Sequence, residues 1–212
     1  MEVPGFMILQ IPRRKISAVS TKFAVMLPLL GAILAGCGGG AKNDTFDLSV
    51  SPAPVTQARS LKGRQLLVAE PTALKALDSE NIVVRLSNSE VQYLANSQWS
   101  DRLPRMVQSK LVEAFQDTGR LVGVGRPGQG LAIDYQVVTD IRAFEVDTKN
   151  NVANIEISVQ LLNDRNGTVR AQDGFRASAR VSGTGNANFV KALDSAFAAA
   201  SREIVAWTLK AL

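Results

Sequence analysis

The chain has 212 residues and a formal net charge of +5, with 24 Lys and Arg, 19 Asp and Glu, one cysteine and no histidine. Without histidine the chain lacks the commonest general base and the commonest nitrogen ligand of metals, and a single cysteine excludes an internal disulfide. We therefore expect no enzyme, with no catalytic, metal or cofactor site, and a carboxylate-dependent hydrolase is the least improbable exception.

The first part of the chain has the composition of a secretory signal peptide. A basic segment comes first, and an apolar run over residues 23–33 follows it. This run is shorter than the roughly 20 apolar residues of a transmembrane helix, so a cleaved signal is favoured over a membrane span. Arg13 and Arg14 also suggest a twin-arginine export signal, but Pro12 before them fits that motif poorly.

A lipobox ends the signal. Leu34, Ala35 and Gly36 precede Cys37, and the small residues give a signal peptidase access to the bond before the cysteine. The Cys37 thiol is the atom that lipoprotein processing modifies with a diacylglyceryl group. Each buried CH₂ contributes roughly 0.8 kcal/mol, so several acyl chains hold a protein firmly on a bilayer. We expect residues 1–36 to be removed and the product to be anchored without spanning the membrane.

The rest of the chain is expected to form one domain on a short tether. Cleavage leaves 20 basic and 18 acidic residues, a net charge of +2. This balance gives no reason to expect nucleic acid as a partner. The glycine-rich residues 37–44 are assigned to the lipidated tether, and residues 45–212 to a single domain long enough to bury a core.

Strands are predicted throughout the first half of the domain. Apolar residues alternate or run continuously in short segments, which is typical of half-buried or fully buried strands. A turn is expected at Asn88 and Ser89. The predicted strands cover residues 45–50, 65–70, 81–87 and 90–94.

A helix is predicted to follow these strands. Ser100 or Asp101 can cap its first turn, Pro104 suits that turn, and Gly119 ends the helix. Apolar residues recur every four positions, so one stripe packs on a sheet and the other faces water. The stripe consists of Leu103, Val107, Leu111 and Phe115.

Three long strands and a final helix are predicted in the second half. The alternating segments 131–146, 152–162 and 168–181 form an antiparallel meander with a turn at residues 163–167. A helix covers residues 186–211. The expected class is α+β, with two helices packed on one face of an antiparallel β-sheet, and the other face is solvated or binds something.

Residues 123–128 match the letters of a dinucleotide-binding fingerprint, GxGxxG. In that motif a strand precedes the glycines and a helix follows them. Here a predicted helix precedes the segment and a strand follows it. We therefore predict a mobile loop between helix and strand, and no nucleotide.

Four acidic residues lie close together in the sequence: Asp134, Asp140, Glu145 and Asp147. Paired carboxylates can perform acid/base chemistry or hold a metal. On one strand, however, Asp134 and Asp140 would lie some 20 Å apart at about 3.3 Å per residue. Solvated charges on the outer face of the sheet are the favoured interpretation.

Arg, Tyr and Trp are concentrated between residues 85 and 108, and such side chains often anchor protein interfaces. Alternatively, Tyr93 and Trp99 seal the core while Arg85 and Glu90 form a cross-strand pair. Spacing alone leaves both interpretations open. The candidate partner-interface residues are Arg85, Glu90, Tyr93, Trp99, Pro104 and Gln108.

The same cluster carries a family resemblance, which extends over the rest of the domain. Its main residues are Ile82, Arg85, Ser87, Glu90, Val91, Tyr93, Trp99, Leu103, Pro104, Val107, Gln108 and Leu111. Further matches are Phe46, Leu48, Leu161, Leu162, Asn163, Asp164, Phe175 and Trp207. The sequence resembles the PqiC-type ABC-transport auxiliary lipoproteins, which are outer-membrane lipoproteins that accompany MCE-domain lipid-transport systems.

The resemblance implies a periplasm-facing adaptor that docks on an MCE-domain protein working with an ABC permease and ATPase. Gly38, rather than aspartate, after the cysteine fits sorting to the outer membrane. Further copies of the same chain are also possible partners, in a homo-oligomer. Two other functions stay open: a lipid carrier with an acyl chain between sheet and helices, and an assembly or plug lipoprotein of another outer-membrane machine.

Overall fold

The computed structural model describes residues 43–49 and 61–212. These residues belong to one compact unit, which spans Ala41–Leu212. Cys37, its lipobox and the signal segment lie outside the described residues, as does almost all of the tether. The predictions of cleavage and lipidation therefore stay predictions.

The three long strands of the second half form an antiparallel meander, as predicted. They are β7 (Tyr135–Asp147), β8 (Val152–Asn163) and β9 (Val169–Arg180). Side chains alternate between buried and more exposed along most of β7 and β8, because one face of the sheet lies against the core. The predicted turn closes with the Asn163 amide donating to the Thr168 carbonyl at 2.9 Å.

The other edge of β7 pairs with three shorter strands, one after another along its length. They are β2 (Leu61–Val68), β3 (Thr72–Ala73) and β4 (Asn81–Arg85), and all three run parallel to β7. The α+β class is confirmed, but the sheet is mixed rather than wholly antiparallel. Parallel pairing requires a long connection, which the intervening helix and strands provide.

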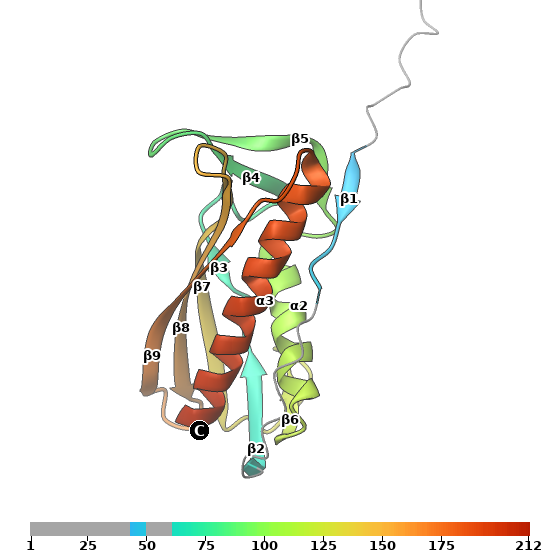
Figure 1. Ribbon diagram of the computed structural model, residues 1–212. Coiled ribbons are helices and arrows are strands. Elements are labelled where there is room, and N and C mark those ends of the chain that lie inside the picture. The colour runs from blue at the N-terminus through green and yellow to red at the C-terminus, as the bar shows by residue number, and fades with distance from the viewer. Residues whose placement is uncertain (1–42, 50–60) are drawn as a thin grey trace, which may run out of the picture. The chain divides into compact units, whose positions relative to one another are not determined.

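Three further strands extend the sheet. β5 (Val91–Trp99) pairs antiparallel with β4, β1 (Asp44–Phe46) lies parallel to the end of β5, and β6 (Leu121–Gly125) lies parallel to β2. β4 and β5 lie at one end of the long strands, and the start of β2 lies at the other (Figure 1).

β6 corrects the predicted mobile loop at residues 123–128. Gly123 and Gly125 belong to the strand, and only the following residues form a turn, in which Gly128 has a φ of 85°. A Cβ at Gly125 would lie 2.5 Å from Leu131 Cδ1, so a side chain there would collide with the returning chain. Close approach of the Leu131 and Gln129 side chains, rather than a phosphate, explains this glycine.

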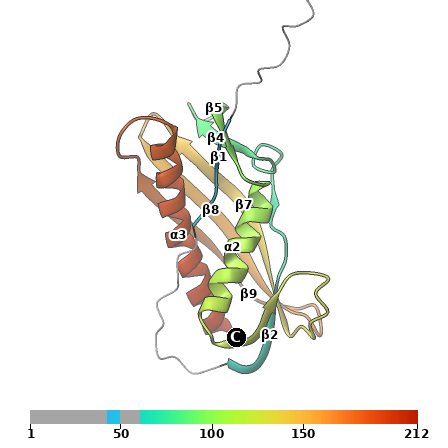
Figure 2. The same cartoon turned by 90° about the vertical axis from the view of Figure 1, so that its right-hand side faces the viewer.

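Both helices pack on one face of the sheet, as predicted (Figure 2). α2 (Leu103–Asp117) contacts β2 and β6, and α3 (Asn186–Ala211) contacts chiefly β8 and β9. No helix in the described part of the chain is both long and apolar enough to cross a membrane. The core between helices and sheet contains an aromatic group, with Trp99 edge-on to Phe144 at 5.8 Å and Phe197 5.9 Å from Phe144.

The start of α2 differs from the prediction. Arg102 occupies the cap position and no side chain caps the helix. The Asp101 carboxylate instead accepts from the Arg102 amide at 2.7 Å, and the Ser100 hydroxyl lies 3.9 Å from the Met106 sulfur. The Leu103 amide donates to the Ser79 carbonyl at 3.0 Å, so a neighbouring loop takes the place of a side-chain cap.

Candidate functional site

Three of the six candidate interface residues are buried, and the partner-contact prediction is corrected for them. Trp99 is 1% exposed, Gln108 is 5% exposed, and Pro104 is buried in the first turn of α2. Gln108 Nε2 donates to the carbonyl of Val68 at 2.9 Å, which joins α2 to β2. Pro104 and Gln108 lie on the buried face of α2, and Trp99, the last residue of β5, lies in the core, so all three side chains stabilise the interior.

Arg85 pairs with Glu145, and not with Glu90 as one interpretation predicted. Its Nη2 donates to Glu145 Oε2 at 2.8 Å, while its Nε donates to the other carboxylate oxygen. Glu145 is 8% exposed, which corrects its assignment as a solvated surface charge. The parallel pairing of β4 with β7 places Glu145 opposite Val83, two residues from Arg85, so that side chains 60 positions apart in the chain can meet. The carboxylate raises the pKa of the Arg85 guanidinium by hydrogen bonding and charge.

Arg85 also orders the turn that follows β4. Its Nη1 donates to the carbonyl oxygens of Ser87 and Asn88 at 3.4 and 3.2 Å. The predicted turn at Asn88 and Ser89 is present. Arg85 therefore connects β7, through its ion pair with Glu145, to the backbone of the hairpin that follows β4.

Glu90 and Tyr93 lie on this hairpin, exposed to solvent. We call residues 86–96, which comprise the turn and the first part of β5, the β4–β5 tip. Tyr93 is 51% exposed and its neighbour Val91 is 40% exposed. Residues two apart on a strand point to the same face, so these two side chains form a small apolar surface next to Glu90. Exposed aromatic and branched side chains in one place are typical of interaction surfaces.

The tip also presents a strand edge. β4 pairs with one edge of β5, whereas β1 pairs with the other edge only at Ser97–Trp99. Within the described ranges, no strand pairs with the outer edge of residues 91–96, although Asn186 Nδ2 donates to the Ala95 carbonyl at 2.8 Å. An edge of this kind can accept a strand from another chain. Sequence reasoning missed this edge, because it depends on how far β1 reaches, and named Val91 only within the family resemblance.

The remaining acidic residues do not converge on a catalytic or metal site. Asp140 pairs with Arg142 at 3.4 Å and accepts from the Thr72 hydroxyl at 2.9 Å, and Asp147 binds Asn150. The described residues contain no group of three carboxylates, cysteines or histidines placed to hold a metal. Asp140 and Asp147 are therefore solvated surface charges, as expected.

The face of the sheet opposite the helices is polar and internally paired. Arg176 donates to both oxygens of Glu156 at 2.8 and 2.9 Å, and Arg142 lies 3.8 Å from the same carboxylate. The hydrogen bonds from Arg176 lower the pKa of Glu156. This arrangement favours solvent on that face over an apolar ligand.

The domain matches a known family along most of its length. Residues 46–205 match the model of the ABC-type transport auxiliary lipoprotein component. The match begins at Phe46 in β1 and ends inside α3, so it contains α2, most of α3 and the whole β4–β5 tip.

A curated relative and two solved structures are similar to this chain. Protein bll6063 of Bradyrhizobium diazoefficiens is 30% identical over 190 residues, or 86% of this chain, which spans about half (51%) of that protein's length. The crystal structure of protein XCC0632 from Xanthomonas campestris is 30% identical, with a TM-score of 0.73, and the match covers 79% of this chain and 95% of that one.

A second solved structure, 17% identical with a TM-score of 0.63, covers 79% of this chain and 99% of its own and supports the fold alone. The family match covers more than half of the chain and includes β2 to β9, α2 and most of α3. This chain belongs to the family of ABC-type transport auxiliary lipoprotein components.

Proposed function

We propose that this protein is an adaptor in an MCE-linked lipid-transport system between the inner and outer membranes. The lipid on Cys37 would hold it on the periplasmic side of the outer membrane, and the β4–β5 tip would dock on an MCE-domain protein that works with an ABC permease and ATPase. Membership of the auxiliary family supports a transport role. The MCE-domain partner comes from the resemblance of the sequence, and the exposed tip is the observation that favours docking.

The composition of the tip supports a protein partner. Tyr93 and Val91 are more exposed than most large apolar side chains of the domain, and Glu90 beside them supplies a charge at the rim. Tyrosine buries a large area while its hydroxyl keeps a polar contact, which suits interfaces that form and separate. The backbone of residues 91–94 adds hydrogen-bonding groups that a partner strand can use.

The tether supports docking near the membrane. Asn43, which directly precedes β1, donates from Nδ2 to Gln98 Oε1 of β5 at 3.0 Å. Asn43 is the sixth residue after Cys37, and an extended chain covers at most about 22 Å over these six steps. A lipid on Cys37 would therefore hold the domain through β1, which pairs with the last residues of β5.

The interior favours an adaptor over a lipid carrier. Ala196 and Ala200 of α3 are 1% and 0% exposed, where the helix lies on β8 and β9. Small residues let a helix approach a sheet closely, and Phe144 and Phe197 fill the neighbouring space. An acyl chain between sheet and helices would have to displace this packing.

Affinity purification from native membranes tests the proposal. The full chain is expressed in its own host, cross-linked and purified, and co-purifying proteins are identified by mass spectrometry. We expect an MCE-domain protein to co-purify with the wild type and with Val122→Asp, whose site on β6 is 66% exposed. Tyr93→Asp should lose it. Recovery of only unrelated proteins, or equal recovery with Tyr93→Asp, contradicts the proposed docking.

A further inference from the structure

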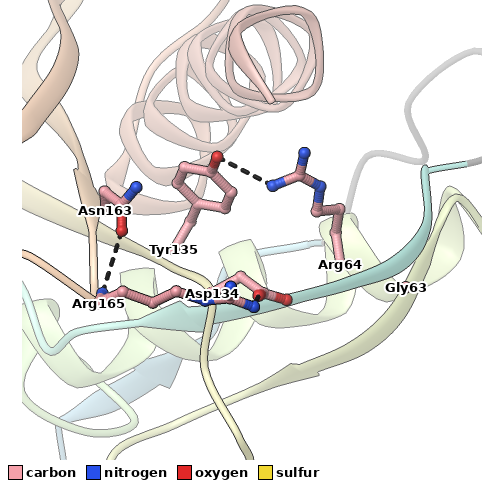
Figure 3. Close-up of a pocket in the computed structure, with 6 residues that line it drawn as sticks. All are labelled: Gly63, Arg64, Asp134, Tyr135, Asn163 and Arg165. Atoms are coloured by element: carbon pink, nitrogen blue, oxygen red, sulfur yellow. Dashed lines mark hydrogen bonds and ion pairs between the residues drawn. The ribbon is translucent and has the colours of Figure 1, made fainter.

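A polar pocket of about 290 Å³ lies at the start of β7, at the opposite end of that strand from its pairing with β4 (Figure 3). The strand has 13 residues, so the pocket and the base of the β4–β5 tip are about 40 Å apart at ~3.3 Å per residue. The pocket is lined by Gly63, Arg64, Asp134, Tyr135, Asn163 and Arg165.

Arg64 is the central cation of this pocket, and it forms no ion pair within the described ranges. It is half-buried, and its Nη1 donates to the Tyr135 hydroxyl oxygen at 2.9 Å. Its guanidinium carbon lies 5.2 Å from the centre of the Tyr135 ring. A guanidinium has five N–H donors, and only one is used by a described residue.

Other donors surround the Arg64 guanidinium. The Tyr135 hydroxyl accepts from Arg64, which leaves its own proton to donate. Asn163 Oδ1 accepts from the Arg165 amide at 3.0 Å, and Figure 3 shows the Asn163 amide nitrogen turned toward Tyr135. The Arg170 guanidinium lies 5.9 Å from the Tyr135 ring centre, and its Nε donates to the Ala211 carbonyl at 2.5 Å.

The pocket has an excess of positive charge. The one lining carboxylate, Asp134, accepts from the Gln65 amide at 3.0 Å and from Arg165 at 2.7 Å. These interactions, with the backbone bond from Gln65 the largest, lower the pKa of Asp134 and keep it charged. Asp134 forms its ion pair with Arg165, and the charge of Arg64 also acts on this carboxylate, although Arg64 forms no ion pair with it within the described ranges. The lining side chains therefore comprise two cations and one anion.

The local shape of β2 gives Arg64 its position. The pairing of β2 with β6 shifts register between Leu61 and Gln65, and Gly63 has a φ of 91°. Such an irregularity turns a side chain away from the direction that a regular strand would give it. A Cβ built at Gly63 has no atom within 4 Å, so the mouth of the pocket is open beside Arg64.

We propose that this pocket binds a single phosphate group, held by Arg64 with donors from Tyr135 and Asn163. Guanidinium groups match the oxygens of phosphate with paired hydrogen bonds, and neutral O–H and N–H donors complete such sites. The phosphate can belong to a phospholipid headgroup or to a small soluble phosphate. The proposal goes beyond the adaptor function and does not rest on it, since docking at the β4–β5 tip can fail while this site binds.

Titration of the full chain, purified in a maltoside detergent that contains no phosphate, tests the site. The two probes are inorganic phosphate and dihexanoyl phosphatidylglycerol below its micelle concentration, followed by calorimetry. We expect saturable binding by the wild type and about tenfold or greater weakening in Arg64→Gln, because a charged hydrogen bond to the anion is lost. Arg180→Gln is the matched control, because it removes one exposed positive charge at the far end of β9.

The two probes separate the sources of the phosphate. Tighter binding of the phospholipid than of inorganic phosphate supports a headgroup site, and equal binding supports a site for soluble phosphate. Absence of saturable binding of both probes overturns the proposal, as does equal affinity in wild type and Arg64→Gln. If Arg64→Gln does not fold, Tyr135→Phe makes the same test, because it removes one of the proposed donors, and unchanged affinity overturns the site.

Discussion

Arg85 and Glu145 form a two-pronged ion pair that joins β4 to β7 at the base of the β4–β5 tip. The side chain of Glu145 is 10% exposed and that of Arg85 is 33% exposed, so the pair is largely shielded from water. A carboxylate in such a place is stable only while its partner is present. The pair therefore links the stability of the domain to the geometry of its proposed docking surface.

Replacement of Arg85 tests this link. Arg85→Ala leaves the Glu145 carboxylate without its partner and should lower the free energy of unfolding by about 2–3 kcal/mol, measured by urea denaturation. Arg105→Ala is the control, because its pair with Asp101 is exposed and should contribute less than about 0.5 kcal/mol. Equal losses in both variants would show that Glu145 does not depend on Arg85.

Replacement of Trp99 tests whether this residue belongs to the core or to a partner interface. Its ring is 1% exposed and meets Phe144 edge-on, so Trp99→Ala should cost about 3–5 kcal/mol of unfolding free energy. Tyr93→Ala removes a ring that is 51% exposed and should cost less than about 1 kcal/mol. A stable Trp99→Ala variant would contradict the placement of this ring in the core.

Asp134 should make stability depend on pH in a defined direction. Its pKa is lowered in the folded state by the Gln65 amide and then by Arg165. The resulting stabilisation is fully present above the unfolded pKa of about 3.9 and is lost as pH falls through the lower folded pKa. Asp134→Asn should therefore flatten the decline of stability between about pH 5 and 2. If the free energy of unfolding, measured by urea titration, declines equally with pH in the wild type and the variant, Asp134 is not the source of the pH dependence.

The predicted lipid anchor has its own test. Cys37→Ala should leave the domain folded, because Cys37 precedes all of the described strands, and should move the protein from the membrane to the soluble fraction. Fractionation of cells followed by circular dichroism of the released protein measures both outcomes. Retention of Cys37→Ala on membranes would show that another feature anchors the chain.

Periodicity predicted the elements whose sequence pattern is long. The strands β7, β8 and β9 and the helix α3 lie close to their predicted bounds, because alternation or helical spacing persists over many residues. The pairing of β2, β3 and β4 with β7 was not predictable in the same way. Such pairing depends on contacts between residues about 60 to 70 positions apart, and no local pattern encodes them.

The candidate site was predicted only in part for the same reason. A cluster rich in Arg, Tyr and Trp marked the segment that contains the proposed docking surface, but its members differ in burial, since Tyr93 is exposed and Trp99 lies in the core. Arg85 has its partner on a strand 60 residues away. The proposed phosphate pocket joins Arg64 to Tyr135 over 71 positions, and only the fold brings these residues together.

Photo-crosslinking in native membranes tests the central claim that the β4–β5 tip docks on an MCE-domain protein. A photoreactive amino acid replaces Tyr93 in the full chain, and Val122 on β6 is replaced in the control, since both sites are well exposed. We predict a crosslink to an MCE-domain protein from position 93 and none from position 122. No crosslink from position 93, or equal yields from both positions, would contradict the claim.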